Sequence, residues 1–354
     1  MKHTIIFFGS FLNYSVQILE KLHHSDTLEI VGIVTTPPQP SSRTKTVTPT
    51  PVQNYADKHH LPVFTPEKLD KQSLDNLQST IYDLPNLFVV AGYGKLLPPS
   101  WLSFPKTAAI NVHFSLLPKY RGANPAEWAL LMGESQTGVS IIEMSPEFDT
   151  GNIISQASLP IEGTDTRQTL YTKLYDLGAE LSLATLPVYL EFKQTPKDGP
   201  STSPPRRSVL KETENSALSF FLPPKPQPAS VPPYARRLSR DDAFIPWEII
   251  QQATSGMPLS TNQSLTPLLT EVVSHLNKTN PLSLLVTSYS LLINCSIRAL
   301  AGFPGVWTKV PTTKGKKRLK LLSAHIQDDK LILDQVQLEG KEPSLFNQIK
   351  NQLV

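Results

Sequence analysis

The chain has 354 residues, more than a typical single domain holds, which predicts two domains. Lys and Arg number 33 against 30 Asp and Glu, so the total charge does not indicate a nucleic-acid partner, and any basic surface must come from local clustering. The single cysteine, Cys295, excludes a disulfide framework and a cysteine-based zinc site, which fits a reducing compartment.

The N-terminal sequence MKHTIIFFGSFLN joins a lysine to a short apolar run, as signal peptides do, but it lacks a small-residue cleavage site and predicts a buried strand instead. The most apolar later stretch, Pro281–Ile297, is interrupted by polar residues and falls short of the ~20 apolar residues that a membrane-spanning helix needs. We therefore expect a soluble, cytoplasmic protein that makes no membrane contact.

In the first half of the chain, apolar β-type runs alternate with amphipathic stretches. In chain order these predict a strand at Thr4–Phe8, a helix at Ser15–Leu22 with Asn13 as its cap, a strand at Ile30–Val34, a polar loop at 35–51, helices up to His60 and at Leu69–Thr80, and strands at Leu87–Ala91 and Ala108–His113. Buried strands that alternate with helices predict an α/β fold with a doubly wound, mostly parallel sheet covered on both faces.

Residues 137–192 complete this first unit. Thr137–Met144 predicts another strand, and Ile153–Leu159 predicts an edge strand. Asp165, with Gln168 three residues later, resembles a capping pair for a helix that carries a leucine-rich side. The first domain is therefore expected to span residues 1–193.

The next segment is rich in proline, with ten between residues 195 and 233, accompanied by Ser, Lys and Gly. This composition cannot pack a core and favours extended, solvated backbone, which predicts a linker over 194–233. A second domain is expected at 234–354. There Ser239–Gln252 begins a new unit, Pro281–Ala301 has a helical pattern, and short β-type runs over Trp307–Leu338 predict a small barrel-like module.

Polar side chains end one of the predicted strands. Asn111 and His113 lie two residues apart and therefore share a face of the strand. Open parallel sheets bind ligands at the carboxyl ends of their strands. The strand at 137–144 is followed by SPEFDTG, so we expect Asp149 at the same edge of the sheet.

An amide, an imidazole and a carboxylate in one place suit acyl transfer, because two donors can stabilise a developing oxyanion while the carboxylate keeps the imidazole charged and can accept a proton. There is no Gly-x-Ser-x-Gly motif and Cys295 is distant in sequence, so a covalent serine or thiol route has no candidate. A structural role stays open at this point, since Asn and His at a strand end often satisfy backbone groups and Asp-Thr-Gly is an ordinary turn.

A longer block of sequence around these residues indicates a particular protein family. Residues 111–154 closely resemble the 10-formyltetrahydrofolate-dependent formyltransferases, through an N-x-H…D-T-G pattern and the run SLLP-x-x-RG-x-x-P-x-x-W at Ser115–Trp128. Within that family the likeness is greatest to the enzymes that act on methionyl initiator tRNA, because residues 35–64, 234–247 and 297–307 also match. The resemblance implies a doubly wound catalytic domain followed by an OB-like C-terminal barrel, here divergent and with an insertion near 250–296.

The resemblance also implies an activity, the transfer of the formyl group of 10-formyltetrahydrofolate to the α-amine of the methionine on initiator tRNA, by direct attack of the neutral amine and without a metal. By the same resemblance, the catalytic residues are Asn111, His113 and Asp149. The formyl-folate is expected to contact two loops, whose residues are Ser115, Leu116, Leu117 and Pro118, and Gly92, Tyr93 and Gly94.

For the tRNA, Arg43 and Lys45 match basic positions of a family loop that enters the acceptor stem. The segment Lys309–Lys320 adds six cations and no acid in twelve residues. Its candidate tRNA contacts are Lys314, Lys316, Lys317 and Arg318. The alternative for this basic segment is an ordinary solvated face. The family expectation for the oligomeric state is a monomer.

Two other functions stay open. Related formyl-folate enzymes act on an amino-sugar nucleotide or hydrolyse the donor, but they often carry a fused second enzyme domain, for which 354 residues leave no room. The second alternative is a catalytically silent RNA-binding relative, which is disfavoured because Asn111, His113 and Asp149 are all present.

Overall fold

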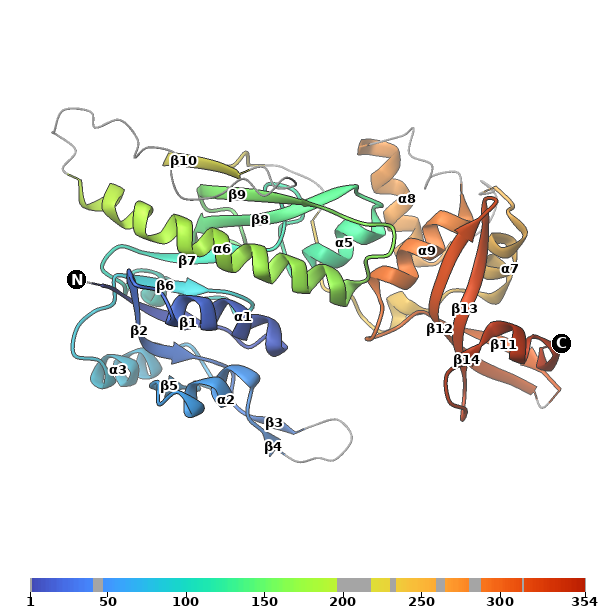
Figure 1. Ribbon diagram of the computed structural model, residues 1–354, viewed down its shortest axis with the longest axis horizontal. Coiled ribbons are helices and arrows are strands. Elements are labelled where there is room, and N and C mark those ends of the chain that lie inside the picture. The colour runs from blue at the N-terminus through green and yellow to red at the C-terminus, as the bar shows by residue number, and fades with distance from the viewer. Residues whose placement is uncertain are drawn as a thin grey trace. The chain divides into compact units, whose positions relative to one another are not determined.

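The computed structural model describes residues 2–40, 47–195, 218–229, 234–258, 265–279, 288–313 and 315–353 (Figure 1). Contacts divide the chain into two compact units. Unit 1 comprises Met1–Ala123, Thr137–Pro160 and Tyr171–Tyr234, and unit 2 comprises Asn124–Gln136, Ile161–Leu170 and Ala235–Val354. Each unit therefore combines segments that are far apart in the sequence, and the linear domain boundaries expected above stay a prediction.

Unit 1 is built on an eight-stranded sheet in the order β10-β9-β8-β7-β6-β1-β2-β5. The parallel strands are β1 (His3–Phe8), β2 (Leu28–Val34), β5 (Val63–Phe64), β6 (Leu87–Val90) and β7 (Ala108–His113). β8 (Gln136–Glu143) is antiparallel to β7. At the edge of the sheet, β10 (Leu218–Lys225) is antiparallel to β9 (Ile153–Pro160). A separate short pair consists of β3 (Gln39–Pro40) and β4 (Val47–Thr48). Because the chain proceeds outward from β1 to β5 and then returns to β6, this order confirms the doubly wound, mostly parallel sheet.

Helices cover both faces of this sheet. They are α1 (Leu12–His23), α2 (Pro51–Lys58), α3 (Lys71–Thr80), α4 (Pro99–Leu102) and, from Tyr171 onward, α6 (Arg167–Gln194). Gly178 of α6 lies against Val112 of β7 and Ile18 of α1, so α1 and α6 cover one face. α3 and α4 cover the other face. None of the helices within the described residues is long and apolar enough to cross a membrane.

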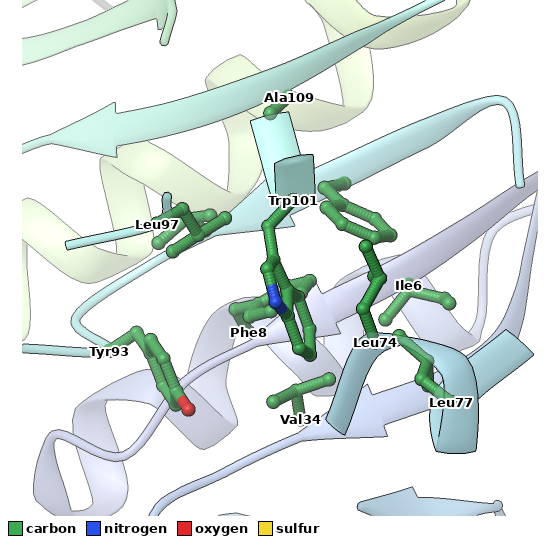
Figure 2. Close-up of a cluster of buried hydrophobic side chains, with 11 residues drawn as sticks. Ile6, Phe8, Val34, Leu74, Leu77, Tyr93, Leu97, Trp101 and Ala109 are labelled. Atoms are coloured by element: carbon green, nitrogen blue, oxygen red, sulfur yellow. The ribbon is translucent and has the colours of Figure 1, made fainter. Parts of the chain in front are cut away.

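The face under α3 and α4 holds the apolar core shown in Figure 2. Ile6 and Phe8 of β1 pack there with Trp101, which is fully buried and donates from Nε1 to the Asp70 carbonyl (3.2 Å). Ala109 of β7 belongs to the same cluster. Residues 109, 111 and 113 share a face of the strand, so the polar positions of β7 continue the face on which this core lies.

One predicted strand position needs correction, and part of the segment predicted as a linker forms a strand. The segment Ile153–Leu159 predicts an edge strand, but β10 pairs outside β9, with Phe220 opposite Ser155. β10 comes from the Pro-rich segment that composition indicates to be a linker. An edge strand tolerates prolines because one side of its backbone has no pairing partner, and the register shifts between Phe220 and Lys225, where two prolines stand.

One predicted helix cap also differs, whereas the pairing of Asp165 with Gln168 near the start of α6 stays a prediction. α1 begins after Phe11 and is not capped by Asn13. Near the start of α6, the Asp165 carboxylate accepts a hydrogen bond from Thr169 Oγ1 (2.9 Å), while Gln168 donates to a backbone carbonyl elsewhere in unit 2. Several neighbouring polar side chains compete for the free backbone groups at a helix start, so a sequence pattern locates a cap only to within a residue or two.

The C-terminal part of unit 2 contains a four-stranded antiparallel sheet of β11 (Trp307–Thr312), β12 (Gly315–Gln327), β13 (Lys330–Leu338) and β14 (Ser344–Leu345). Its helices are α5 (Pro125–Leu131), α7 (Trp247–Ser255), α8 (Pro267–Thr279), α9 (Tyr289–Ala299) and α10 (Phe346–Ile349), with 3-10 turns at Asp241–Ala243 and Lys350–Gln352. α9 packs against β12, where Asn294 donates to the Ala324 carbonyl (3.0 Å). The expected C-terminal β-module is confirmed as an antiparallel sheet, and the described residues near 250–296 are mostly helical.

Candidate active site

The second half of β7 presents Asn111 and His113 on the face that carries the Trp101 core. Ile110 and Val112 alternate with them and are buried on the opposite face, which confirms the predicted alternation. Asn111 is in register with Val90 of β6, and His113 with Ser140 of β8, so both lie in the interior of the sheet. His113 is only 5% exposed and Asn111 is half-buried.

Asp149 reaches these side chains by a route that the sequence did not indicate. The expectation that the strands at 108–113 and 137–144 end at the same edge is wrong, because β8 is antiparallel to β7 and the Met144 N–H donates to the Ala109 carbonyl (2.8 Å). The loop to β9 therefore starts beside the amino end of β7. Gly151 packs so closely against the end of β8 that a Cβ at this position would overlap the Glu143 carbonyl oxygen.

The Asp149 carboxylate is the point at which the candidate residues meet. Its Oδ1 accepts a hydrogen bond from Asn111 Nδ2 (3.1 Å). Its Oδ2 accepts from the Gly122 N–H (2.8 Å) and lies 3.5 Å from His113 Nδ1. With this carboxylate 10% exposed, the structure brings the amide, the imidazole and the carboxylate into one largely buried cluster.

Both ring nitrogens of His113 face oxygen atoms. Nδ1 faces the Asp149 carboxylate, and Nε2 lies 3.0 Å from the Tyr120 carbonyl oxygen. An ionised carboxylate and a carbonyl both accept hydrogen bonds, so a proton on either ring nitrogen has an acceptor beside it. The site therefore holds the imidazole between two acceptors.

The predicted folate loop at Ser115–Pro118 is held by buried hydroxyl groups. Ser115 Oγ donates to the Lys119 carbonyl (2.7 Å), and the Ser140 hydroxyl donates to the Ser115 carbonyl (2.7 Å). The side chains of Ser115 and Leu117 are buried, whereas Leu116 and Pro118 are half-buried. Only the latter two side chains are therefore partly accessible to a ligand.

The second predicted folate loop follows β6, the neighbour of β7. Gly92 and Gly94 have φ values of 70° and 76°, a left-handed conformation that glycine adopts without steric cost. Tyr93 between them packs in the core of Figure 2, and no described residue hydrogen-bonds its buried hydroxyl. Burial raises the pKa of Tyr93 to about 12, so this hydroxyl is a neutral donor at pH 7.

The predicted tRNA contacts are only partly within the described residues. Arg43, Lys45 and Lys314 lie outside them. Lys316, Lys317 and Arg318 lie on β12, but not on one face.

Within the β11–β12 hairpin, Lys316 and Arg318 are exposed and lie opposite Pro311 and Lys309 of β11. Lys317 alternates to the side that carries the buried Leu319. The outward side, which we call the basic face, consists of Trp307, Lys309, Lys316, Arg318 and Lys320, and the Arg318 guanidinium lies over the Trp307 ring (4.5 Å to the centroid).

Two residues at the candidate active site were not predicted from the sequence. Gln227 donates from Nε2 to the carbonyls of Asp149 (2.9 Å) and Gly151 (2.7 Å), and it accepts from the Arg121 guanidinium. Arg121 stands in the RG pair of the family-like run, which is a usable signal. Gln227 gives none, because it lies in a Pro-rich segment with the composition of a linker.

Comparison with known proteins defines the class to which this fold and site belong. The Formyl transferase family profile matches residues 1–186, more than half of the 354 residues, and the chain therefore belongs to the formyltransferase family. No group of three or more His, Cys, Asp or Glu that could hold a metal ion lies among the residues the structure describes.

Similarity to individual proteins is more specific than the match to the family profile. The chain is 35% identical over 344 residues to methionyl-tRNA formyltransferase from Staphylococcus epidermidis, which covers 96% of this chain and 92% of that protein. It is 45% identical over 191 residues to methionyl-tRNA formyltransferase from Listeria welshimeri, covering 54% of this chain and 60% of that protein. A crystal structure of a 4-N formyltransferase from Francisella tularensis matches with a TM-score of 0.50 at 14% identity, over 92% of this chain and 99% of that one, which shows a shared fold.

Proposed function

We propose that this chain transfers the formyl group of 10-formyltetrahydrofolate to the α-amine of methionyl initiator tRNA, in the cytoplasm and at the start of protein synthesis. The observation that carries the proposal is the Asp149 carboxylate, which contacts Asn111, His113 and the Gly122 N–H in a chain of the formyltransferase family. The tRNA acceptor is supported by the similarity to the Staphylococcus epidermidis enzyme along nearly the whole chain.

The reaction needs no covalent enzyme intermediate, because the amine of the acceptor is itself the nucleophile. An α-amine titrates near pH ~8, so its neutral form is available at neutral pH. Its nitrogen bonds to the formyl carbon, and the formyl oxygen becomes an oxyanion. The bond from that carbon to N10 of tetrahydrofolate then breaks, and the proton lost by the amine ends on N10.

Asn111 and His113 stabilise the oxyanion in this scheme, each by donating a hydrogen bond to it. Asp149 holds the Asn111 amide through one oxygen and faces the His113 imidazole with the other. In the substrate complex, His113 Nε2 exchanges its contact with the Tyr120 carbonyl for a hydrogen bond to the oxyanion. Catalytic hydrogen bonds often form fully only in that complex. Asp149 accepts the amine proton, directly or through water, and returns it toward the leaving nitrogen.

The formyl-folate is assigned to the loops that follow β6 and β7. Leu116 and Pro118 offer partly accessible side chains, and Gly94 is open, since a Cβ there would meet no other atom within 4 Å. Backbone groups of such loops suit the hydrogen-bonding edge of a pterin. The basic face is assigned to the tRNA, because cations beside an aromatic ring combine phosphate neutralisation with base stacking.

A transfer assay with three arms tests the proposal. The purified chain is supplied with 10-formyltetrahydrofolate labelled in the formyl group and with methionyl initiator tRNA, an amino-sugar nucleotide, or no acceptor. We expect label on the methionyl ester of the tRNA. Label on the sugar amine alone, or release of labelled formate without transfer, would contradict the proposal and favour the other two formyl-folate activities.

A further inference from the structure

The Pro-rich segment after β10 places one side chain against the loop that carries Asp149. Gln227 stands between Pro226 and Pro228. Proline fixes its own φ and restricts the residue before it, so the backbone on both sides of this glutamine has limited freedom. The segment is thus suited to present the Gln227 amide in one direction.

The Gln227 amide uses its full hydrogen-bonding capacity. Nε2 donates to the carbonyls of Asp149 (2.9 Å) and Gly151 (2.7 Å), and Oε1 accepts from Arg121 Nε (3.1 Å) and Nη2 (2.9 Å). A primary amide has two N–H donors and two acceptor lone pairs, so these contacts satisfy it completely. They also fix its orientation, because exchanging oxygen and nitrogen would turn an amino group towards the guanidinium.

Arg121 connects this amide to the other side of the site. It is 8% exposed, and its Nη2 also donates to the Pro228 carbonyl (2.9 Å). Its neighbour Tyr120 faces His113 Nε2 with its carbonyl, and its other neighbour Gly122 donates its N–H to Asp149 Oδ2. Arg121 therefore belongs to the loop that contacts one ring nitrogen of His113, while Asp149 contacts the other.

We propose that Gln227, together with Arg121, is a positioning residue of the active site. It joins the loop of residues 120–122 to the loop of residues 149–151, and so keeps the Asp149 carboxylate aligned with His113 and Asn111. It acts on the reaction through Asp149 and does not itself stabilise the reacting atoms. The catalytic part of this inference rests on the proposed formyl transfer.

Two variants test this role. Gln227→Met keeps the length of the side chain and removes its hydrogen bonds, whereas Gln227→Glu keeps the acceptor for Arg121 but sets an oxygen against the carbonyls of Asp149 and Gly151. We expect both to lower kcat by ~10- to 100-fold, because a displacement of about 1 Å at a reacting centre can cost ~100-fold. The KM values for formyl-folate and for methionyl-tRNA should stay near wild type.

The matched control is Gln72→Met, at an exposed glutamine of α3, which should keep the wild-type kcat. The ¹⁵N chemical shifts of the His113 ring supply a readout that does not depend on turnover. They should move in both Gln227 variants and remain unchanged in the control, because the partners of both ring nitrogens are held by the joined loops.

A wild-type kcat in folded Gln227→Met would overturn the inference, and so would a raised KM at constant kcat, since it would place Gln227 in substrate binding. If Gln227→Met does not fold, Gln227→Glu carries the same measurements. A wild-type chain that formylates no methionyl-tRNA refutes the proposed function alone. The ¹⁵N shifts of the His113 ring then test the positioning role. Shifts that change in the Gln227 variants support that role, and shifts that stay unchanged overturn it.

Discussion

At the scale of single residues, two strained backbone conformations lie beside the imidazole of His113. Asp149 has a φ of 55° and Tyr120 a φ of 61°, both in the left-handed region that residues other than glycine rarely adopt. Such a residue costs about 1 to 3 kcal/mol and persists only where its surroundings enforce it. Here the Asp149 carboxylate and the Tyr120 carbonyl are the two acceptors that face His113. The fold therefore gives up some stability to set acceptors on both sides of this ring.

The first prediction concerns the amide of Asn111. Asn111→Ala removes one proposed oxyanion donor, and kcat should fall by ~100- to 1000-fold, the usual cost of losing such a donor. Binding of formyl-folate should change little, because the oxyanion exists only during the reaction. Single-turnover kinetics and calorimetric titration measure the two quantities. Asn76→Ala, at an exposed amide of α3, is the control; an active Asn111→Ala variant would refute the role.

At the scale of elements, the β8–β9 connection decides where Asp149 lies. β8 is antiparallel to β7, so the connection starts at the amino end of β7, and its close return past Glu143 is possible only because residue 151 has no side chain. Gln227, in the segment that follows the edge strand β10, then contacts the backbone of this connection. The position of one carboxylate therefore depends on a hairpin, a glycine and an edge strand together.

The second prediction tests that glycine. Gly151→Ala should displace the Asp149 loop, because the added Cβ overlaps the Glu143 carbonyl, and kcat should fall by ~100-fold if the carboxylate moves by about 1 Å. Gly163→Ala is the matched control, since a Cβ at Gly163 meets no other atom within 4 Å. Turnover numbers of the two variants provide the comparison. Equal activity in both would show that the close packing of the loop is dispensable.

The third prediction concerns the contact between β8 and α6. Glu143 accepts hydrogen bonds from Tyr189 (2.6 Å), Lys193 (2.8 Å) and Asn152 (3.2 Å). Burial by itself raises the pKa of Glu143, but these hydrogen bonds outweigh it and hold the pKa below its ordinary value of 4.5. A depressed pKa in the folded state means that the stabilisation is complete above pH 4.5 and is lost as the pH falls through the lower folded value.

Glu143→Gln should therefore lower the free energy of unfolding by about 1.5 to 3 kcal/mol at pH 7, the range for hydrogen bonds to a charged group. The difference from wild type should shrink as the pH falls below 4.5. Denaturant unfolding at several pH values measures it, and Glu180→Gln, at an exposed position of α6, is the control. A difference that stays constant with pH would exclude the ionised carboxylate as its source.

At the scale of the whole molecule, the candidate catalytic residues and the basic face belong to different units. Asn111, His113 and Asp149 all lie in unit 1, whereas the basic face lies on β11 and β12 of unit 2. The total charge of +3 does not show this arrangement, because Lys309, Lys316, Arg318 and Lys320 lie together on one side of a single hairpin. In the proposed function, the reaction and the phosphate contacts therefore fall to different units.

The fourth prediction tests the basic face by salt dependence. Lys316→Ala and Arg318→Ala should each weaken binding of methionyl-tRNA and reduce the slope of log K against log salt by about 1, the amount expected for one lost phosphate contact. Lys317→Ala, one residue away on the other side of β12, should leave the slope unchanged. Filter binding at several salt concentrations measures all three. Equal slopes in the three variants and the wild type would leave the basic face without a role in tRNA binding.

The sequence alone determined the local features of this protein. Alternation in β7 placed Asn111 and His113 on one face, and apolar runs located β1, β6 and β7 to within a few residues, because side-chain direction in a strand depends only on position along it. The family-like run from Ser115 to Trp128 also indicated the formyltransferase family that the comparisons show.

Only the tertiary structure decided the direction of β8, the edge position of β10 and the contacts of Gln227. The physical reason is the same in each case. Whether a strand pairs parallel or antiparallel, and which distant backbone a side chain meets, depends on contacts between segments far apart in the chain. No pattern of neighbouring residues contains that information.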